Sequence, residues 1–419
     1  MNLGRSRPAL RIAALAAALL AMLPAGACST AGTKGPAPDA AATLFAGGYV
    51  VDPASSGDAV RADVLVVGDR IAGVGRNVRA PAGARRVDVT GRYLLPGLWD
   101  MHAHVAAEGP VGDALEDYVR NGVLGIRDMG GRSEEILALR DEVAAGRRFG
   151  PTMVVAGPTL NGTQGGDFHR AVANAAEARA AVRELAAQGV DFIKIHRQLS
   201  REAFFAIRYE ARALDLPFGG HVPLALDWID ASDAGMRTFE HIQTIVENEL
   251  EAGVDPVRAT FDALERLGGA RGDSIFAAMA RNRTYWTPTL TFYRTSWAGD
   301  SPERRALKQR AYASMSPLVA RAARAGVPIL AGTDLLERRG AGLLDELDQL
   351  VAAGLTPRQA LAAATATPFR LTGRGPGPIR TGREASFLIL DADPLANVAN
   401  VRLLRGVVLR GRQLERGAR

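Results

Sequence analysis

The sequence predicts an α/β fold, a (β/α)8 TIM barrel with a small β-sandwich assembled from both ends of the chain. Three observations lead to this prediction. Short apolar segments alternate with helical patterns of about 10–16 residues through the middle of the chain, which is the rhythm of parallel β/α units. Alternating apolar segments with Gly and Asp turns occur at both ends. Histidine and aspartate side chains stand where several of the strand candidates end.

Eight apolar segments in the middle of the chain are the candidate barrel strands. They cover residues 93–99, 123–128, 152–156, 190–196, 218–222, 237–242, 284–290 and 328–333. Helical patterns lie between them, such as the Ala-, Glu- and Arg-rich segment 175–187 and the segment that Ser200 opens as a capping residue. The rhythm favours a closed barrel, and an open doubly wound sheet is the alternative that shares it.

The two ends of the chain share a different pattern, in which short strands with alternating apolar residues are separated by tight turns. Residues 43–50 show this pattern near the start, and residues 386–391 show it near the end. We therefore expect a composite β-sandwich of residues 43–94 and 376–419, and a barrel domain of residues 95–375.

The first segment has the composition of an export signal. Three arginines precede an apolar run at residues 12–23, which is too short to span a bilayer but suits a signal peptide. A small-residue cleavage site of the A-x-A type ends at Ala27. We therefore expect residues 1–27 to be a signal peptide and residues 28–42 to be a flexible tether.

The single cysteine of the chain, Cys28, directly follows this cleavage site. In bacterial lipoproteins the cysteine at this place carries the lipid, which would anchor the protein to a membrane. Simple cleavage with a free thiol is the alternative, because Ala25 stands where such proteins usually carry Leu. Both alternatives predict an exported protein, either periplasmic or a lipoprotein of the cell envelope. One cysteine cannot form a disulfide within the chain, so the fold depends on its core.

The charge distribution argues against nucleic acid as a partner. The net charge is +6, and the expected leader carries three arginines and no acidic residue, which leaves +3 for the mature chain. No Lys/Arg block with interleaved aromatic residues is present. We expect a small-molecule substrate instead, and association into a homo-oligomer is compatible with the sequence.

Four of the six histidines stand where candidate strands end. His102 and His104 form a His-x-His pair after the first strand, and period-two alternation places both rings on one side of the chain. His221 and His241 end two later strands, and Asp334 follows the last one. Active sites of TIM barrels are built at these strand ends. Together these side chains predict a site for a divalent metal, with zinc as the favoured ion.

Lysine is rare in this chain. Of its 51 lysines and arginines, the only lysines are Lys34, Lys194 and Lys308. Lys194 lies between two isoleucines in an expected barrel strand. A protonated amine is costly to bury there and would be repelled by metal ions. Lys194 must therefore be neutral, paired or chemically altered, unless its amine reaches solvent from the strand end.

The segment from Pro96 to His104 resembles the first-strand signature of the amidohydrolase superfamily, and the lysine, the later histidines and the aspartate follow in the order found there. Within the superfamily, the chain is similar to imidazolonepropionase- and prolidase-related amidohydrolases with a binuclear centre. The chain departs from many of these relatives at His196, where they carry Tyr. The resemblance implies that the barrel is a metallohydrolase domain.

The resemblance also implies two divalent metal ions with six protein ligands, namely His102, His104, Lys194, His221, His241 and Asp334. The His-x-His pair and the aspartate would hold one ion, and the two later histidines would hold the other. Lys194 would carry a carbon dioxide adduct, and this carbamate would bridge both ions. A buried cation would thereby become an anionic ligand.

The expected reaction is hydrolysis of a C–N bond, in an amide or a dipeptide-like substrate, by a hydroxide that bridges the two metals. Asp334 would accept the proton of the hydroxide and return it to the leaving nitrogen. A lactonase or phosphotriesterase with the same centre is the alternative within hydrolases. A non-catalytic scaffold that kept the amidohydrolase fold is the alternative from another class.

Two further residues are candidates for contact with the substrate. His196 shares a strand face with Lys194, so we expect it to face the site and to orient the substrate or support a metal ligand. Arg127, at the end of the second candidate strand, is expected to bind a substrate carboxylate. His169 lies in a long loop, where it is either part of a lid or a surface residue.

The leader generates the first testable prediction. Because a cleavage site directly precedes Cys28, we expect the mature chain from a bacterial envelope fraction to begin at Cys28. Intact-mass measurement would show this start, with or without the added mass of a lipid. Recovery of a cytosolic protein that still begins with Met1 would contradict export.

Overall fold

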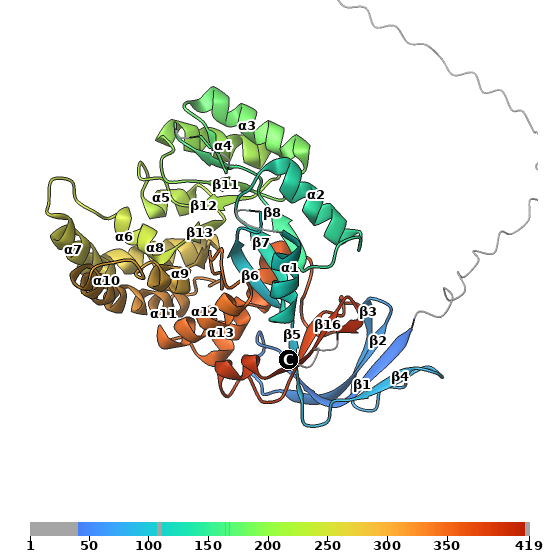
Figure 1. The fold of residues 1–419 in the computed structure, drawn as a ribbon. Helices are drawn as coiled ribbons and strands as arrows, with labels where there is room; N and C mark the ends of the chain where they lie inside the picture. Colours follow the sequence, from blue (N-terminus) through green and yellow to red (C-terminus); the bar gives the residue numbers. More distant parts are fainter. Residues whose placement is uncertain (1–40, 107–110, 164, 167, 415–419) are drawn as a thin grey trace, which may run out of the picture. The chain divides into compact units, whose positions relative to one another are not determined.

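The computed structural model describes residues 41–106, 111–163, 165–166 and 168–414, which belong to one compact unit (Figure 1). The expected signal peptide and the expected tether up to residue 40 lie outside the described residues. Within the described ranges, no helix is both long enough and apolar enough to cross a membrane. The first described strand begins at Ala42, the last residue of the expected tether.

The middle of the chain forms parallel strands that belong to two sheets. The three-stranded sheet contains β6 (Leu98–Ala103), β7 (Val123–Asp128) and β8 (Thr152–Val155). The six-stranded sheet has the order β10-β9-β11-β12-β13-β14. Its strands are β9 (Thr159–Asn161), β10 (His169–Ala171), β11 (Ile193–Ile195), β12 (Phe218–Gly220), β13 (Thr238–Glu240) and β14 (Tyr285–Thr287). The expected α/β fold with parallel strands is confirmed.

The ladders of these two sheets do not join into one closed ring within the described residues. One backbone hydrogen bond, from Asp191 N, links the start of β11 to β8 at 2.8 Å. The last expected strand, residues 328–333, forms only an isolated bridge to β14 at Ile329. It also accepts a hydrogen bond from Met101 N of β6 at 2.9 Å. Individual bonds, not ladders, therefore connect the sheets at both gaps.

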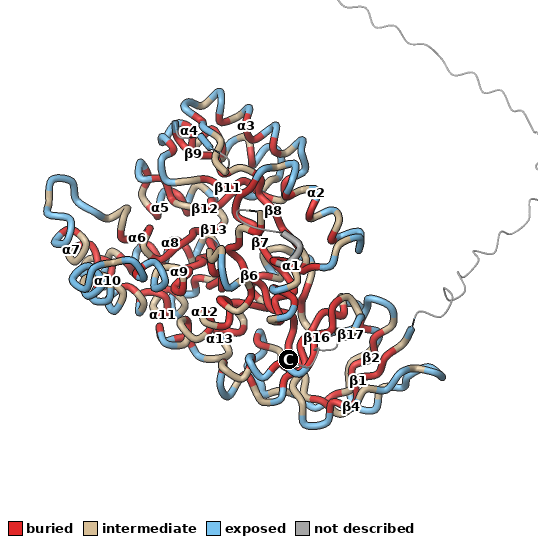
Figure 2. The backbone as a smooth tube through the Cα atoms, in the orientation of Figure 1, coloured by how far each residue is buried: buried red, intermediate tan, exposed pale blue. Residues whose placement is uncertain are grey.

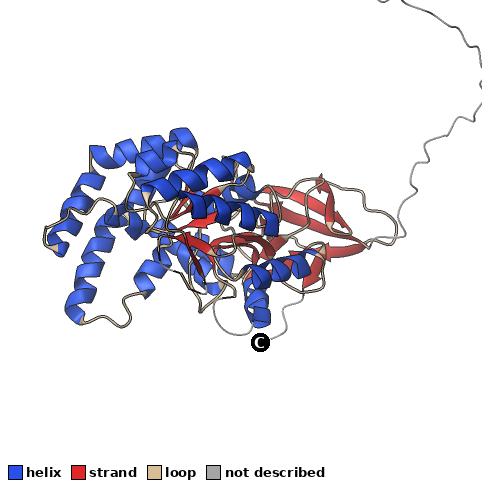
Figure 3. Ribbon diagram, turned by 90° about the horizontal axis from the view of Figure 1, so that it is seen from above, coloured by secondary structure: helices blue, strands red, loops and turns tan. Residues whose placement is uncertain are grey.

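Helices lie between the strands and around the parallel sheets (Figure 3). They are α1 (Val111–Arg120), α2 (Ser133–Ala144), α3 (Ala175–Gln188), α4 (Arg201–Ala213), α5 (Trp228–Asp233), α6 (Ile242–Glu247), α7 (Pro256–Gly268), α8 (Ala270–Asn282), α9 (Leu290–Thr295), α10 (Pro302–Met315), α11 (Pro317–Arg324), α12 (Ala341–Ala352), α13 (Pro357–Ala363) and α14 (Ala366–Thr372), with a 3-10 helix at Val398–Arg402. Ser200 caps α4 as expected, because its hydroxyl oxygen accepts a hydrogen bond from Ala203 N at 3.1 Å.

Strands from both ends of the chain join one eight-stranded sheet, with the order β17-β16-β15-β5-β1-β2-β3 and β4 paired to β1. They are β1 (Ala42–Val50), β2 (Val60–Val67), β3 (Arg70–Gly75), β4 (Arg85–Asp88), β5 (Tyr93–Pro96), β15 (Phe387–Leu390), β16 (Leu404–Leu409) and β17 (Arg412–Leu414). The sheet has its own apolar core, where Phe45 packs edge-on against Phe387 with ring centroids 5.2 Å apart. Ile71 N of β3 donates to Arg383 O at 2.9 Å, so the β3 edge contacts the segment before β15.

The first expected barrel strand, residues 93–99, is divided between the two regions. β5 ends at Pro96 in the terminal sheet, and β6 begins at Leu98 in the parallel sheet. Gly97 marks the break, because a Cβ at this position would lie 2.6 Å from the side chain of Leu124. Glycine therefore permits the close approach of β6 to β7 where the chain leaves one sheet for the other.

The parallel strands other than β10 are buried along most of their length (Figure 2). Every residue of β6 and β7 is buried, including polar ones. Strands covered by helices on one face and by packed side chains on the other have two dry faces. Any polar group on these strands must therefore find its partners inside the protein, or at the strand ends.

Candidate metal centre

Polar side chains meet at the carboxyl ends of the parallel strands, as the sequence predicts. They come from β6, β11, β12, β13 and the segment that follows residue 328. The structure places together all six expected ligands, His102, His104, Lys194, His221, His241 and Asp334.

The carboxylate of Asp334 lies among three histidine rings. Its Oδ1 is 3.6 Å from His102 Nε2 and 3.4 Å from His104 Nε2. Its Oδ2 is 3.8 Å from His241 Nε2. One ligand atom each of His102, His241 and Asp334 lies within 4.8 Å of the others, a spacing at which all three can bind one metal ion. His241, which the resemblance gives to the second ion, thus also lies close to ligands of the first.

The ring of His221 lies next to His241, and the ring of His196 lies next to His221. The ring centroids of His221 and His241 are 4.7 Å apart, and those of His221 and His196 are 4.3 Å apart. The Nδ1 atom of His221 is buried and has no hydrogen-bond partner among the described residues. A buried polar atom without a partner is costly, and a metal ion would remove this cost. This atom therefore fits the second expected ion.

The glycines before His221 make room for Lys194. The register of β11 and β12 pairs Lys194 with Gly219. Gly220 has a φ of +133°, and a Cβ there would lie 2.9 Å from Lys194 Cδ and 2.2 Å from Ile195 O. Only glycine fits at this position. Lys194 is 3% exposed, and burial lowers its pKa from 10.5 to about 8.

Burial also governs the protonation of the other candidate ligands. It lowers the pKa of His102 and His221 well below the usual 6.5, and it lowers the pKa of His241 to about 3. Burial raises the pKa of Asp334 to about 7, although the nearby Lys194 opposes this change. Neutral imidazole is the form that binds a metal ion, so the dry strand ends prepare the histidines for this role.

Three residues of the centre have a left-handed backbone. The φ angle is +63° at His241, +54° at Asp334 and +47° at Thr289, whose hydroxyl oxygen lies 2.8 Å from His241 Nδ1. Such angles cost about 1–3 kcal/mol for residues other than glycine. Surrounding contacts maintain them, for example a hydrogen bond from Asp334 N to His102 O at 2.7 Å. Strain of this kind is concentrated at functional sites in proteins.

Two carboxylates that the sequence motifs do not include lie beneath the histidines. Glu240 precedes His241 and is fully buried, with its Oε2 3.0 Å from His102 Nδ1. Asp100 is also fully buried and accepts a hydrogen bond from the hydroxyl of Thr333 at 2.7 Å. Burial raises the pKa of Asp100 to about 6. The signal for both was an acidic residue within an apolar strand, the same kind of signal that identified the buried lysine.

Arg127 lies beneath the histidines, and its guanidinium is directed into the protein. It donates hydrogen bonds of 2.7–3.2 Å to Met101 O, Thr238 Oγ1, Glu240 Oε1 and Thr287 Oγ1. An arginine has five N–H groups, so protein acceptors occupy most of them. This placement favours a structural or positioning role for Arg127 over the expected contact with a substrate carboxylate.

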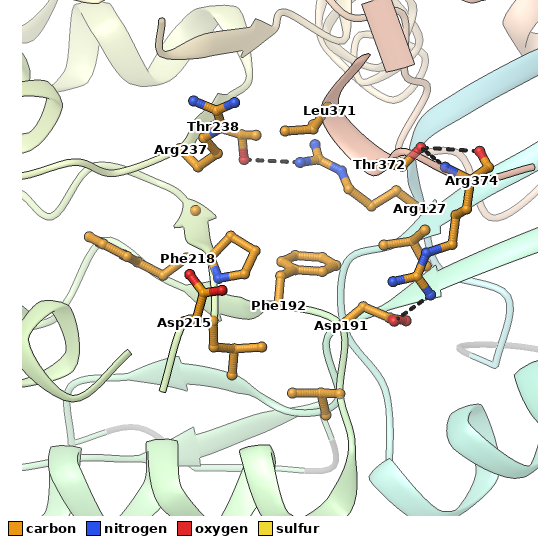
Figure 4. Close-up of a pocket in the computed structure, with 15 residues that line it drawn as sticks. Arg127, Asp191, Phe192, Asp215, Phe218, Arg237, Thr238, Leu371, Thr372 and Arg374 are labelled. Carbon is orange, nitrogen blue, oxygen red and sulfur yellow. Dashed lines mark hydrogen bonds and ion pairs between the residues drawn. The ribbon is translucent and has the colours of Figure 1, made fainter. Parts of the chain in front are cut away.

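A cavity of about 390 Å³ lies at the opposite ends of the parallel strands (Figure 4). Phe192, Phe218 and Arg237 line it where β11, β12 and β13 begin. Arg127 reaches the same cavity from β7, with its guanidinium carbon 5.6 Å from the centre of the Phe192 ring. The six candidate ligands do not line this cavity, so it is separate from the candidate metal centre.

Fold and site together define an α/β protein with a candidate metal centre at the carboxyl ends of its parallel strands. The sequence profile of the amidohydrolase family matches residues 93–414, which is most of the chain. The chain therefore belongs to the amidohydrolase family, as the sequence motifs predict.

Curated relatives match only short stretches. A dihydroorotase of Geobacter metallireducens is 39% identical over 66 residues, which are 16% of this chain and 15% of the relative. An imidazolonepropionase of Streptomyces avermitilis is 36% identical over 86 residues, 20% of this chain and 18% of the relative. The chain thus matches less than a fifth of the length of these two relatives.

Solved structures match over nearly the whole chain. A putative prolidase from Bifidobacterium longum has a TM-score of 0.72 at 24% identity, over 90% of this chain and 96% of the other. A structure described as an amidohydrolase has a TM-score of 0.73 at 23% identity, over 90% of this chain and 100% of the other. At this identity the likeness shows a shared fold.

The centre generates a prediction about metal content. We expect the purified mature protein to bind about two equivalents of zinc or a similar ion, because neutral histidines and a carboxylate converge there. His102→Ala should lower zinc affinity by about 100-fold or more. Removal of a residue that only supports a ligand costs about 10–100-fold, and removal of a ligand itself should cost at least the upper end of this range. Calorimetric zinc titration measures both quantities.

His169→Ala is the matched control, because the ring of His169 packs against His196 and is not one of the six candidate ligands. Its zinc affinity and stoichiometry should equal those of the unmodified protein. A protein that binds no metal, or a His102→Ala variant with unchanged affinity, would contradict the assignment.

Proposed function

We propose that the protein is a metal-dependent hydrolase that cleaves a C–N bond in an amide or a dipeptide-like substrate. The observation that carries this proposal is the position of Asp334, 3.4–3.8 Å from three histidine nitrogens at the strand ends. Membership of the amidohydrolase family supports a hydrolytic reaction. The similar fold of a putative prolidase supports a dipeptide-like substrate.

The proposed centre contains two divalent ions, with zinc favoured. His102, His104 and Asp334 would hold one ion, and His221 and His241 would hold the other. The unpartnered Nδ1 of His221 and the burial of the rings support this arrangement. Two such ions would lower the pKa of a water molecule between them and polarise a carbonyl group.

Lys194 is the proposed bridging ligand, as a carbamate. Its neutral amine would attack carbon dioxide, an N–C bond would form, and the nitrogen would release a proton to leave an anionic group. Burial supports this step, because the lowered pKa of about 8 increases the neutral fraction of the amine near neutral pH. The product would also remove a buried cation from the vicinity of metal ions.

Asp334 is the proposed proton carrier. Its carboxylate would accept a proton from the attacking water and deliver it to the leaving nitrogen. His196 is the proposed substrate contact at the outer side, where its Nδ1 lies 3.3 Å from Asn161 Oδ1 and its ring is half-buried.

The finer features of the fold are also part of the proposal. The hydrogen bonds at both gaps between the parallel sheets support a distorted (β/α)8 barrel. The shared sheet and its separate core support a composite domain of residues 43–94 and 376–419, with two packed halves. The leader composition supports export, with Cys28 as the place of a lipid anchor.

A substrate screen of the zinc-loaded protein tests the function. We expect dipeptides or N-acyl amino acids to be hydrolysed faster than lactones and phosphotriesters, which the same centre could also attack. Release of the amine is measured for the first two classes. Faster turnover of a lactone or phosphotriester would contradict C–N cleavage. A protein that binds zinc and hydrolyses none of the four classes would favour the scaffold alternative.

Substitution of Lys194 tests the bridge. We expect Lys194→Ala to lose most bound metal and activity, because no group would connect the two ions. Acetate or propionate should restore part of both by supplying a carboxylate in the vacated space. Lys194→Arg should not restore them, since a guanidinium stays protonated and forms no carbamate. Metal analysis and turnover are measured together. Normal values for Lys194→Arg would show that Lys194 does not bridge.

A further inference from the structure

A buried ion pair lies directly beneath the candidate metal centre. Arg127 of β7 is 3% exposed and Glu240 of β13 is fully buried, with Nη2 of the arginine 2.8 Å from Oε1 of the glutamate. Removing two charges from water is costly, and apolar residues of similar volume often stabilise a fold as well or better. General stability therefore does not explain why charges occupy this position.

The two oxygens of Glu240 have different partners. Oε1 accepts hydrogen bonds from Arg127 and from the hydroxyl of Thr238 at 2.7 Å. Oε2 lies 3.0 Å from Nδ1 of His102. A carboxylate offers only acceptors, so the proton of this last hydrogen bond belongs to His102 Nδ1. The other ring nitrogen, Nε2, then carries a lone pair and is directed toward Asp334, 3.6 Å away.

We propose that Arg127 and Glu240 are positioning residues that hold His102 as its Nδ1–H tautomer, with Nε2 available to a metal ion. This inference rests on the proposed function of the centre and deepens it, because it assigns the orientation of one ligand to a pair beneath it. Partners of this kind fix ring orientation and raise the basicity of a ligand histidine. Arg127 acts through Glu240 and has no contact with the metal position.

The geometry of Arg127 explains why an arginine occupies this place. Its guanidinium reaches β6 through Met101 O, β13 through Thr238 and Glu240, and β14 through Thr287. A planar group with several fixed donors can hold all these acceptors at once. A lysine would place one ammonium there and could not span the same set. The glutamate is therefore fixed from several strands at the same time.

The cavity at the opposite strand ends gives experimental access to this pair. Figure 4 shows Arg127 in its lining, with the guanidinium bonded to Thr238. Removal of the Arg127 side chain would open the cavity toward Glu240. A small guanidinium ion added to the solution would then be able to occupy the vacated place.

The experiment compares zinc affinity in full mature chains that carry Glu240→Gln, Arg127→Ala or Arg237→Ala. We expect Glu240→Gln and Arg127→Ala to bind zinc about 10–100-fold more weakly, the range typical for loss of groups that orient a ligand. Millimolar guanidinium should restore affinity in Arg127→Ala and leave Glu240→Gln unchanged. Arg237→Ala is the matched control, because Arg237 lines the same cavity and contacts Tyr285 and Arg283. It should bind zinc normally.

Nitrogen NMR of the histidine rings in the unmodified protein gives a second readout that needs no variant. We expect His102 to show a protonated Nδ1 and an unprotonated or metal-bound Nε2. The opposite tautomer would overturn the inference, as would normal zinc affinity in both Glu240→Gln and Arg127→Ala. An unmodified protein that binds no zinc would instead contradict the proposed function, so the two failures are distinguishable.

Discussion

The junction between β6 and the segment at residues 328–334 is the constraint on which the candidate centre depends. Met101 N donates to Ala331 O at 2.9 Å, and Asp334 N donates to His102 O at 2.7 Å. These bonds join the first and last elements of the parallel region, although more than 200 residues separate them. They place the carboxylate of Asp334 against the His-x-His pair. Without this junction, the His-x-His pair at the end of β6 would lack its acidic partner.

The dry environment of the strand ends shifts the pKa values of the candidate ligands. The same burial that keeps the histidines neutral also lowers the pKa of Lys194 and raises the pKa of Asp334. Perturbed pKa values of this kind are concentrated at functional sites. The ion pair beneath them has the complementary task of fixing geometry. Desolvation tunes the groups above, and hydrogen bonds from several strands orient them.

Most of the parallel strands could be predicted from the sequence, because an apolar run and a polar residue at its end are local signals. The expected strand at 123–128 coincides with β7, and the capping role of Ser200 is confirmed. The break at Gly97 was not predicted, because it depends on how closely two strands approach. The weak pairing of residues 328–333 was not predicted either, since the number of ladder bonds depends on the relative position of neighbouring strands.

The sequence by itself indicated which residues form the candidate centre, because histidines, a lysine and an aspartate follow strand signals at recognisable spacings. It did not determine what lies beneath them. Glu240 precedes a histidine and Arg127 is one of many arginines, so neither has a local pattern that reveals its partner. Only the tertiary structure brings β7 and β13 together and directs the guanidinium inward. Hydrogen bonds between residues 113 positions apart depend on distances in space, which the order of residues alone does not contain.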